Sequence, residues 1–206
     1  MRDAISADEV SRVAAEGERR KKFFQEAGLD LVAARRRMAG FLGAKDPVLD
    51  AGTGGGHAAM ALAGLGRRVV SVDQDAAELR KACVYLRLAG CLDRVELRQM
   101  DVNRMEFEGG SFENILCVAL IHHLSDPGKA FGQMDRVLAG GGRVVLSDFN
   151  ARGFAVVDQI HAAEGGVHAV SGFGCPDAEA FFGGLNYDLE RSDDEFHWVL
   201  VMRKPS

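Results

Sequence analysis

The stretch VLDAGTGGGHAAMALAGLGRRVVSVDQD, residues 48–75, decides the fold of this chain. It opens with a short apolar strand, passes through a glycine-rich turn into a helix over about residues 57–65, and reaches a second strand that ends at Asp73. This order of elements predicts a parallel sheet covered by helices. Because glycine lets the backbone approach a ligand closely, the turn is also the first candidate for a binding site.

The alternation of strands and helices continues beyond this stretch. One helix begins at Asp75 and stops at Gly90, and another begins at Pro127. Such a pattern predicts a mostly parallel sheet with helices on both faces, and a ligand at the carboxyl ends of the strands. The strands are predicted at residues 48–50, 69–73, 95–99, 114–119 and 143–148.

Two helices precede the first strand, so we divide the chain into an N-terminal arm, residues 1–43, and a domain, residues 44–206. Ser6 and Glu9 form the sequence of a capping box at the start of the arm. An amphipathic arm must bury its apolar stripe somewhere. We expect it to fold as a cap over the carboxyl edge of the sheet. Packing on the flank of the sheet or in a homodimer interface is the open alternative.

Charge and composition exclude several classes of protein. Residues 1–42 hold nine basic and seven acidic side chains, so we interpret the basic clusters at residues 19–22 and 35–37 as solvated helix faces. The whole chain has a net charge of −5, which argues against a nucleic-acid binder. The four cysteines form no CxxC pair, and no apolar run suits a signal peptide or membrane span. We therefore expect a cytoplasmic protein.

Two carboxylates flank the glycine loop and favour one class of ligand. Asp50 lies two residues before Gly52, where it would repel a pyrophosphate, and His57 stands where a dinucleotide loop has its last glycine. Asp73, at the end of the second strand, can accept hydrogen bonds from both hydroxyls of a ribose. S-adenosylmethionine has an ammonium, a sulfonium and a ribose but no phosphate, and it fits this arrangement.

Longer motifs resemble the class I S-adenosylmethionine-dependent methyltransferases over about residues 47–149. VLDAGTGGGHAAMALA resembles the first motif of the family, VVSVDQD its acidic second strand, and MDVNRMEF the segment that meets the adenine. FENILCVALIHHLSDPGKAFGQMDRVLAGGGRVVLSDF resembles the fourth and fifth strands of small-molecule and quinone-type members. The tail, YDLERSDDEFHWVLVMRK, resembles the closing hairpin. The resemblance implies a doubly wound, Rossmann-like seven-stranded sheet, mostly parallel with an antiparallel C-terminal hairpin.

The resemblance also implies a set of cofactor residues. Asp73 would hold the ribose, Asp101 would accept from the adenine amino group, and Ala119 would lie near the sulfonium. The complete set is Asp50, Gly52, Thr53, Gly54, Asp73, Gln74, Asp101, Val102 and Ala119.

The acceptor side is less defined. CVALIHHL departs from the Asn/Asp-Pro-Pro-aromatic motif of amino-group methyltransferases acting on adenine or glutamine, so a small-molecule acceptor is expected. His122 and His123 are the candidates for a general base, although a scaffold role is favoured because adjacent residues rarely face the same ligand. We predict no metal site, since spacing places no third ligand beside them. His161 and His168 are interpreted as surface histidines.

Three functions remain open at this point: a small-molecule methyltransferase, which we favour, a non-catalytic protein that binds S-adenosylmethionine or S-adenosylhomocysteine, and a nicotinamide oxidoreductase. The glycine-rich segment over residues 152–184 has no motif, and we expect part of the acceptor site there.

Overall fold

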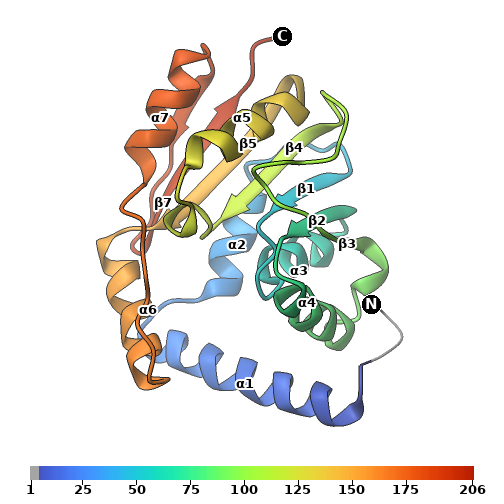
Figure 1. Ribbon diagram of the computed structural model, residues 1–206, viewed down its shortest axis with the longest axis vertical. Coiled ribbons are helices and arrows are strands. Elements are labelled where there is room, and N and C mark those ends of the chain that lie inside the picture. The colour runs from blue at the N-terminus through green and yellow to red at the C-terminus, as the bar shows by residue number, and fades with distance from the viewer. Residues whose placement is uncertain (1–4) are drawn as a thin grey trace.

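Seven strands form one mixed sheet, in the order β3-β2-β1-β4-β5-β7-β6 (Figure 1). The computed structural model describes residues 5–206; the first four residues of the arm lie outside it. Strands β1 to β5 are parallel, whereas β7 is antiparallel to both β5 and β6. The predicted fold class is therefore confirmed. The strands are β1 Val48–Ala51, β2 Val69–Asp73, β3 Val95–Gln99, β4 Phe112–Val118, β5 Leu138–Phe149, β6 Asp188–Arg191 and β7 His197–Arg203.

Helices cover both faces of the sheet. Because side chains alternate along a strand, Val48 packs toward one face and Leu49 toward the other. Helices α2 and α3 pack on the face that holds Val48, and α5 and α7 on the face that holds Leu49. No described helix is long and apolar enough to cross a membrane. The helices are α1 Ala7–Glu26, α2 Leu31–Ala39, α3 His57–Gly64, α4 Ala76–Leu88, α5 Pro127–Val137, α6 Ala151–Ala163 and α7 Cys175–Gly184, with 3₁₀ turns at Leu92–Arg94 and Ile121–His123.

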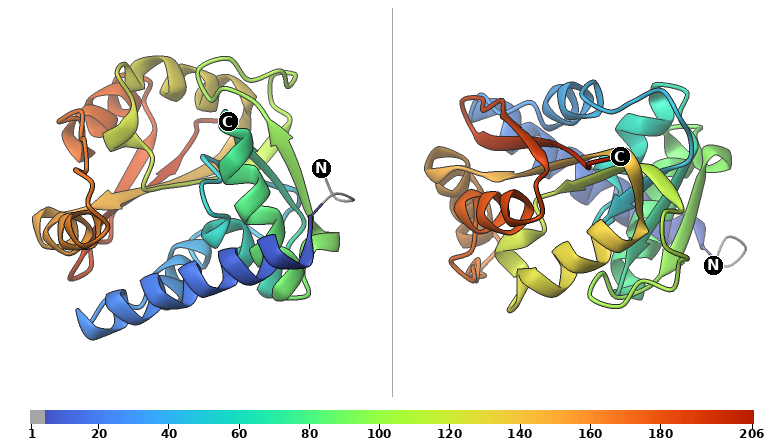
Figure 2. Two further views of the ribbon diagram at one scale, coloured as in Figure 1. Left: turned by 60° about the horizontal axis from the view of Figure 1, so that its bottom comes forward. Right: turned by 90° about the horizontal axis from the view of Figure 1, so that it is seen from above.

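Helix α1 crosses the molecule below the carboxyl edge of the sheet, from α4 to α6 (Figures 1 and 2). The Ser6 hydroxyl accepts from the Glu9 N–H at 3.2 Å, as the capping box requires. The Glu9 carboxylate instead pairs with Arg80 in α4, so it ties α1 to the body. At the other end of α1, Arg20 donates two hydrogen bonds to Glu164, at 2.9 and 2.5 Å. Both ends of α1 are thus fixed by ion pairs.

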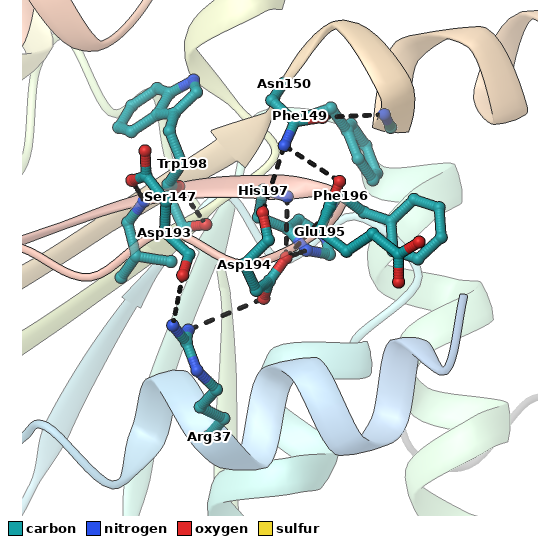
Figure 3. Close-up of polar contacts among 12 residues, drawn as sticks. Arg37, Ser147, Phe149, Asn150, Asp193, Asp194, Glu195, Phe196, His197 and Trp198 are labelled. Carbon is teal, nitrogen blue, oxygen red and sulfur yellow. Dashed lines mark hydrogen bonds and ion pairs between the residues drawn. The ribbon is translucent and has the colours of Figure 1, made fainter. Parts of the chain in front are cut away.

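Helix α2 is joined to the body more deeply than α1. Met38 and Leu42, at and just beyond its end, lie in a core cluster with sheet residues. Arg37 donates to the backbone carbonyls of Ser192 and Asp193 in the turn between β6 and β7. Figure 3 shows the contact with Asp193 and the ion pair of Arg37 with Asp194. The same turn is ordered by the Asp194 carboxylate, which accepts from the backbone N–H groups of residues 196 and 197. The predicted hairpin turn therefore also anchors α2, whereas the division at residue 43 stays a prediction.

Candidate active site

The glycine loop lies at the carboxyl end of β1, beside the ends of β2 and β4. Gly52 has φ +90°, and a Cβ there would meet the Leu120 side chain at 3.0 Å. Gly56 has φ +78°, and a Cβ there would lie 2.7 Å from that of Ala82 in α4. Both positions therefore require glycine for backbone conformation and for close packing. The loop follows β1 as the strand–turn–helix pattern predicted.

Asp73 holds the glycine loop against the end of β2. Its carboxylate accepts from the Gly54 N–H at 2.7 Å and from the Asp75 N–H at 2.9 Å. Asp75 is also the N-cap of α4, through its bond to the Ala77 N–H. The Asp73 side chain is partly exposed. It therefore sets the shape of the loop and retains an exposed carboxylate surface.

Two buried ionisable groups, one acidic and one basic, lie behind this loop. Asp50 is fully buried; Ser71 donates to its Oδ2 at 2.6 Å, while Oδ1 has no partner among the described residues. Burial raises the pKa of Asp50 to about 7. Arg35 of α2 is also buried, its Nη1 has no partner among residues 5–206, and burial lowers its pKa to about 10 despite the charges of Asp148 and Asp50. Two polar groups of opposite charge thus remain unsatisfied.

Sequence reasoning missed Arg35 because it grouped this residue with the basic cluster 35–37 and interpreted the cluster as solvated. Arg35 lies on the face of α2 that also buries Met38, and only 7% of it is exposed. Its neighbour Arg36 is exposed, as expected. The signal was the helical spacing of three between Arg35 and Met38, which places both on one face.

A cavity of about 520 Å³ lies between α1 and the carboxyl edge of the sheet. Its walls come from α1, α2, α3, α4, the end of β4 and α6. Arg35, Gly55 and Ala119 lie along the wall nearest the glycine loop, and His122 and His168 lie elsewhere in the lining. Side chains of the arm therefore form part of the cavity lining, as a cap would require, while the role of the arm stays a prediction.

Most of the predicted cofactor residues surround the loop rather than the cavity. Among the described residues that line the cavity, Ala119 alone belongs to the predicted set of cofactor residues. Leu120 lies over Gly52. Asp101 is exposed in the turn after β3 and accepts from both nitrogens of Asn103, while Val102 is buried. The predicted adenine residues and the cavity thus occupy different parts of the same sheet edge.

Three imidazoles gather in the cavity beyond Ala119. His122 Nδ1 lies 2.7 Å from the carboxylate of Asp148, and both side chains are buried. His123 follows it in the same turn, and the two rings lie 3.9 Å apart. His168 comes from the segment after α6, and its ring lies 4.9 Å from that of His122. The interpretation of His168 as a surface histidine is wrong, because its side chain is only 4% exposed.

Residues 49–146 match the family described as a methyltransferase domain. The chain carries a class I S-adenosylmethionine-dependent methyltransferase domain. It is 32% identical over 127 residues to a ubiquinone biosynthesis O-methyltransferase of Pseudomonas aeruginosa, which covers 61% of this chain and 53% of the relative. An uncharacterized methyltransferase of Bacillus subtilis, YcgJ, is 32% identical over 116 residues, or 56% of this chain and 46% of the relative. The chain thus spans about half the length of these curated relatives.

Solved structures agree with the fold of the methyltransferase domain. A SAM-dependent methyltransferase of Methanosarcina mazei superposes with a TM-score of 0.66 at 16% identity, covering 82% of this chain and 97% of that one. The family match ends at residue 146, before α6 and the segment that carries His168. The match therefore covers the glycine loop, whereas α1, α6 and the segment that carries His168 lie outside it.

Proposed function

We propose that this protein transfers the methyl group of S-adenosylmethionine to a small-molecule acceptor bound between α1 and the carboxyl edge of the sheet. The observation that carries the proposal is the unsatisfied pair of buried groups, Asp50 Oδ1 and Arg35 Nη1, beside the glycine loop. A buried charge without a partner is costly, so such a pair is kept where a ligand completes it. The methionine part of the cofactor carries an ammonium and a carboxylate, which match the two groups in charge.

The other cofactor contacts follow the strand ends. Asp73 would accept from the ribose hydroxyls with the oxygen surface that its loop contacts leave open. Gln74 and Val102 would lie beside the adenine, and Asp101 would accept from its amino group. For Ala119 we propose contact with the sulfonium, because it lies at the end of β4 and lines the cavity. The methyl group would then point at the imidazole end of the cavity.

Catalysis by this arrangement depends mostly on alignment. Methyl transfer is an in-line displacement at a sulfonium carbon, and holding two reactants in line supplies about 7–11 kcal/mol in favourable cases. Helix α1 would exclude water from the reacting groups. The name of the Pseudomonas relative refers to an O-methyltransferase, so phenols and catechols are the first acceptors to test. Cytoplasmic location and a homodimer stay predictions.

Cofactor binding is tested first, by calorimetry with S-adenosylmethionine, S-adenosylhomocysteine and NAD. Arg35→Met should weaken S-adenosylmethionine by about 10- to 100-fold, because it removes a hydrogen bond to a charged group worth about 1.5–3 kcal/mol. It should still fold, since it removes a buried charge whose Nη1 has no hydrogen-bond partner among residues 5–206. Arg36→Met, one residue along the same helix and exposed, is the matched control and should leave affinity unchanged.

Transfer is tested next, by counting radiolabelled methyl groups on a panel of phenols, catechols, carboxylic acids and amines. Labelled product supports the proposal. Tight cofactor binding without turnover on any acceptor would favour the non-catalytic binding protein. Stabilisation by NAD in preference to S-adenosylmethionine would contradict the proposal altogether.

A further inference from the structure

We propose that His122, His123 and His168 form a binding site for one divalent transition-metal ion, with zinc as the reference metal. Each residue offers a ring nitrogen, and these three nitrogens lie within 4.8 Å of one another. Two of the ligands come from the turn after β4, and the third comes from the segment after α6. Three histidines with further positions open are a common ligand set of catalytic zinc sites.

The carboxylates behind the imidazoles favour this assignment. His122 Nδ1 lies 2.7 Å from Asp148, and His168 Nδ1 lies 3.2 Å from Asp158. A histidine that binds a metal usually donates its other ring N–H to a carboxylate or a carbonyl, which fixes the tautomer. With Nδ1–H donated in this way, Nε2 is the nitrogen that carries the free lone pair. Two such lone pairs in one cluster can bind one shared cation.

Backbone contacts hold the third ligand in place without a metal. Ser171 donates its N–H to the carbonyl of His122 at 2.8 Å, and its hydroxyl contacts the carbonyl of Ile121 at 3.4 Å. The segment that carries His168 is therefore fastened to the turn that carries the other two ligands. A site assembled from segments far apart in the sequence requires such a contact.

The three ring nitrogens must move closer together to bind one ion. Zinc–nitrogen bonds of about 2.0–2.1 Å in a tetrahedral site place the nitrogens about 3.3 Å apart, closer than the 4.8 Å limit of the cluster. His168 lies between Gly165 and Gly172, which have φ +77° and +83°. Glycines on both sides let this segment adjust. His123 is exposed, so its ring also has room to turn.

The donor set selects the class of metal. Three neutral imidazoles suit zinc, cobalt, nickel, copper or ferrous iron. Magnesium and calcium prefer oxygen ligands and are not expected here. The three histidines line the cavity, so the open positions of the ion would face the acceptor.

The role of the ion rests on the proposed function. An acceptor hydroxyl would displace water from the metal, which lowers the pKa of a bound hydroxyl, and its proton would leave to solvent. The oxygen lone pair would then form the bond to the methyl carbon. The carbon–sulfur bond breaks with its electron pair left on sulfur, so the cofactor becomes S-adenosylhomocysteine. In this scheme His122 binds and orients the ion and is not the general base.

The experiment titrates chelator-treated full-length protein with zinc in competition with a chromophoric chelator, and separately with cobalt, whose visible bands report coordination. We expect one equivalent bound through nitrogen ligands. His168→Gln should abolish stoichiometric binding, and Asp158→Asn should weaken it by about 10- to 100-fold. Asp158 is exposed, so its substitution should not disturb folding. His161→Gln is the matched control, because His161 stacks on His168 but lies outside the three-nitrogen group.

Two results would overturn the site: no stoichiometric zinc or cobalt in the wild-type protein, or binding that is unchanged in folded His168→Gln. Metal affinity and S-adenosylmethionine affinity are measured separately, so a failure of the metal site is distinct from a failure of the proposed function. The role of the ion is supported if zinc restores methylation of catechols to chelator-treated protein. It is wrong if the metal-free protein is fully active.

Discussion

The glycine loop and the cavity beside it, which we propose as the donor side and the acceptor side, are built in different ways. On the donor side, β1, the glycine loop and β2 follow one another along the chain, and contacts such as that of Asp73 with Gly54, 19 residues apart, shape them. On the acceptor side, α1, the turn after β4 and the segment after α6 meet through contacts such as Arg20 with Glu164, 144 residues apart. Local order can be inferred from sequence, whereas a wall assembled from distant segments cannot.

Substituting Asp73 tests the donor side and should have the largest effect. Asp73→Ala should lower S-adenosylmethionine affinity by at least about 3 kcal/mol, or about 100-fold, because two charge-assisted hydrogen bonds to the ribose are lost. Calorimetry measures the change. Asp75→Ser is the control: it removes the neighbouring carboxylate but keeps a capping oxygen for α4. Unchanged affinity in folded Asp73→Ala would defeat the ribose assignment.

Deleting residues 1–28 tests the acceptor side by removing α1. The deletion spares α2, whose Met38 is part of the core. Acceptor methylation should fall by about 100-fold or more, since water enters and alignment is lost. Cofactor affinity should change only a few-fold, because no residue before 29 belongs to the predicted cofactor set.

The control for the deletion is Arg12→Ala, on the exposed face of α1, which should keep full turnover. Full methylation by the folded, truncated protein would show that α1 is not a cap. Global unfolding or a change of mass by light scattering would instead indicate a flank or dimer role.

The change in protonation of Asp50 when the cofactor binds is the smallest of the effects that we predict. Burial raises the pKa of Asp50 from 3.8 to about 7, so the folded protein keeps a proton that the unfolded chain releases. Stability from this group therefore falls as pH rises from about 4 to 7. The cofactor ammonium favours the ionised form, so binding at pH 6 should release about one proton.

Calorimetry in buffers of different ionisation enthalpy measures this proton. Asp50→Asn should abolish the proton release. The control is Asp93→Asn, which replaces an exposed acid after α4 and should leave the release unchanged. Equal proton release by wild type and Asp50→Asn would show that another group titrates.

Sequence predicted the strands well because each carries its own apolar pattern and stops at a polar or glycine residue. β3 has the predicted bounds, Val95–Gln99. β5 begins at Leu138 rather than residue 143, because a register shift in its pairing with β4 accommodates the intervening glycines. The strand was predicted only from residue 143, after these glycines, but tertiary pairing extends it through them.

The site could be predicted only where its residues flank one loop in the sequence. Asp50 and Asp73 could be assigned to the glycine loop because they flank it in the sequence. Arg35 was missed although its helical spacing with Met38 indicated burial, and His168 could not be assigned, because its burial depends on how the segment after α6 packs. The burial of such a side chain depends on tertiary contacts, so the local sequence pattern does not predict it for a single histidine.

The ion pairs that fix α1 also bear on how the chain folds during synthesis. The helix is made before its partners, because Arg80 follows Glu9 by 71 residues and Glu164 follows Arg20 by 144. Until Phe149, Val156 and Phe196 emerge, Phe24 lacks the apolar cluster against which it packs, and exposed apolar surface of this kind promotes association with other chains. Contacts of such long range also slow folding. Helix α1 is therefore made before its partners and is among the last elements to acquire its contacts.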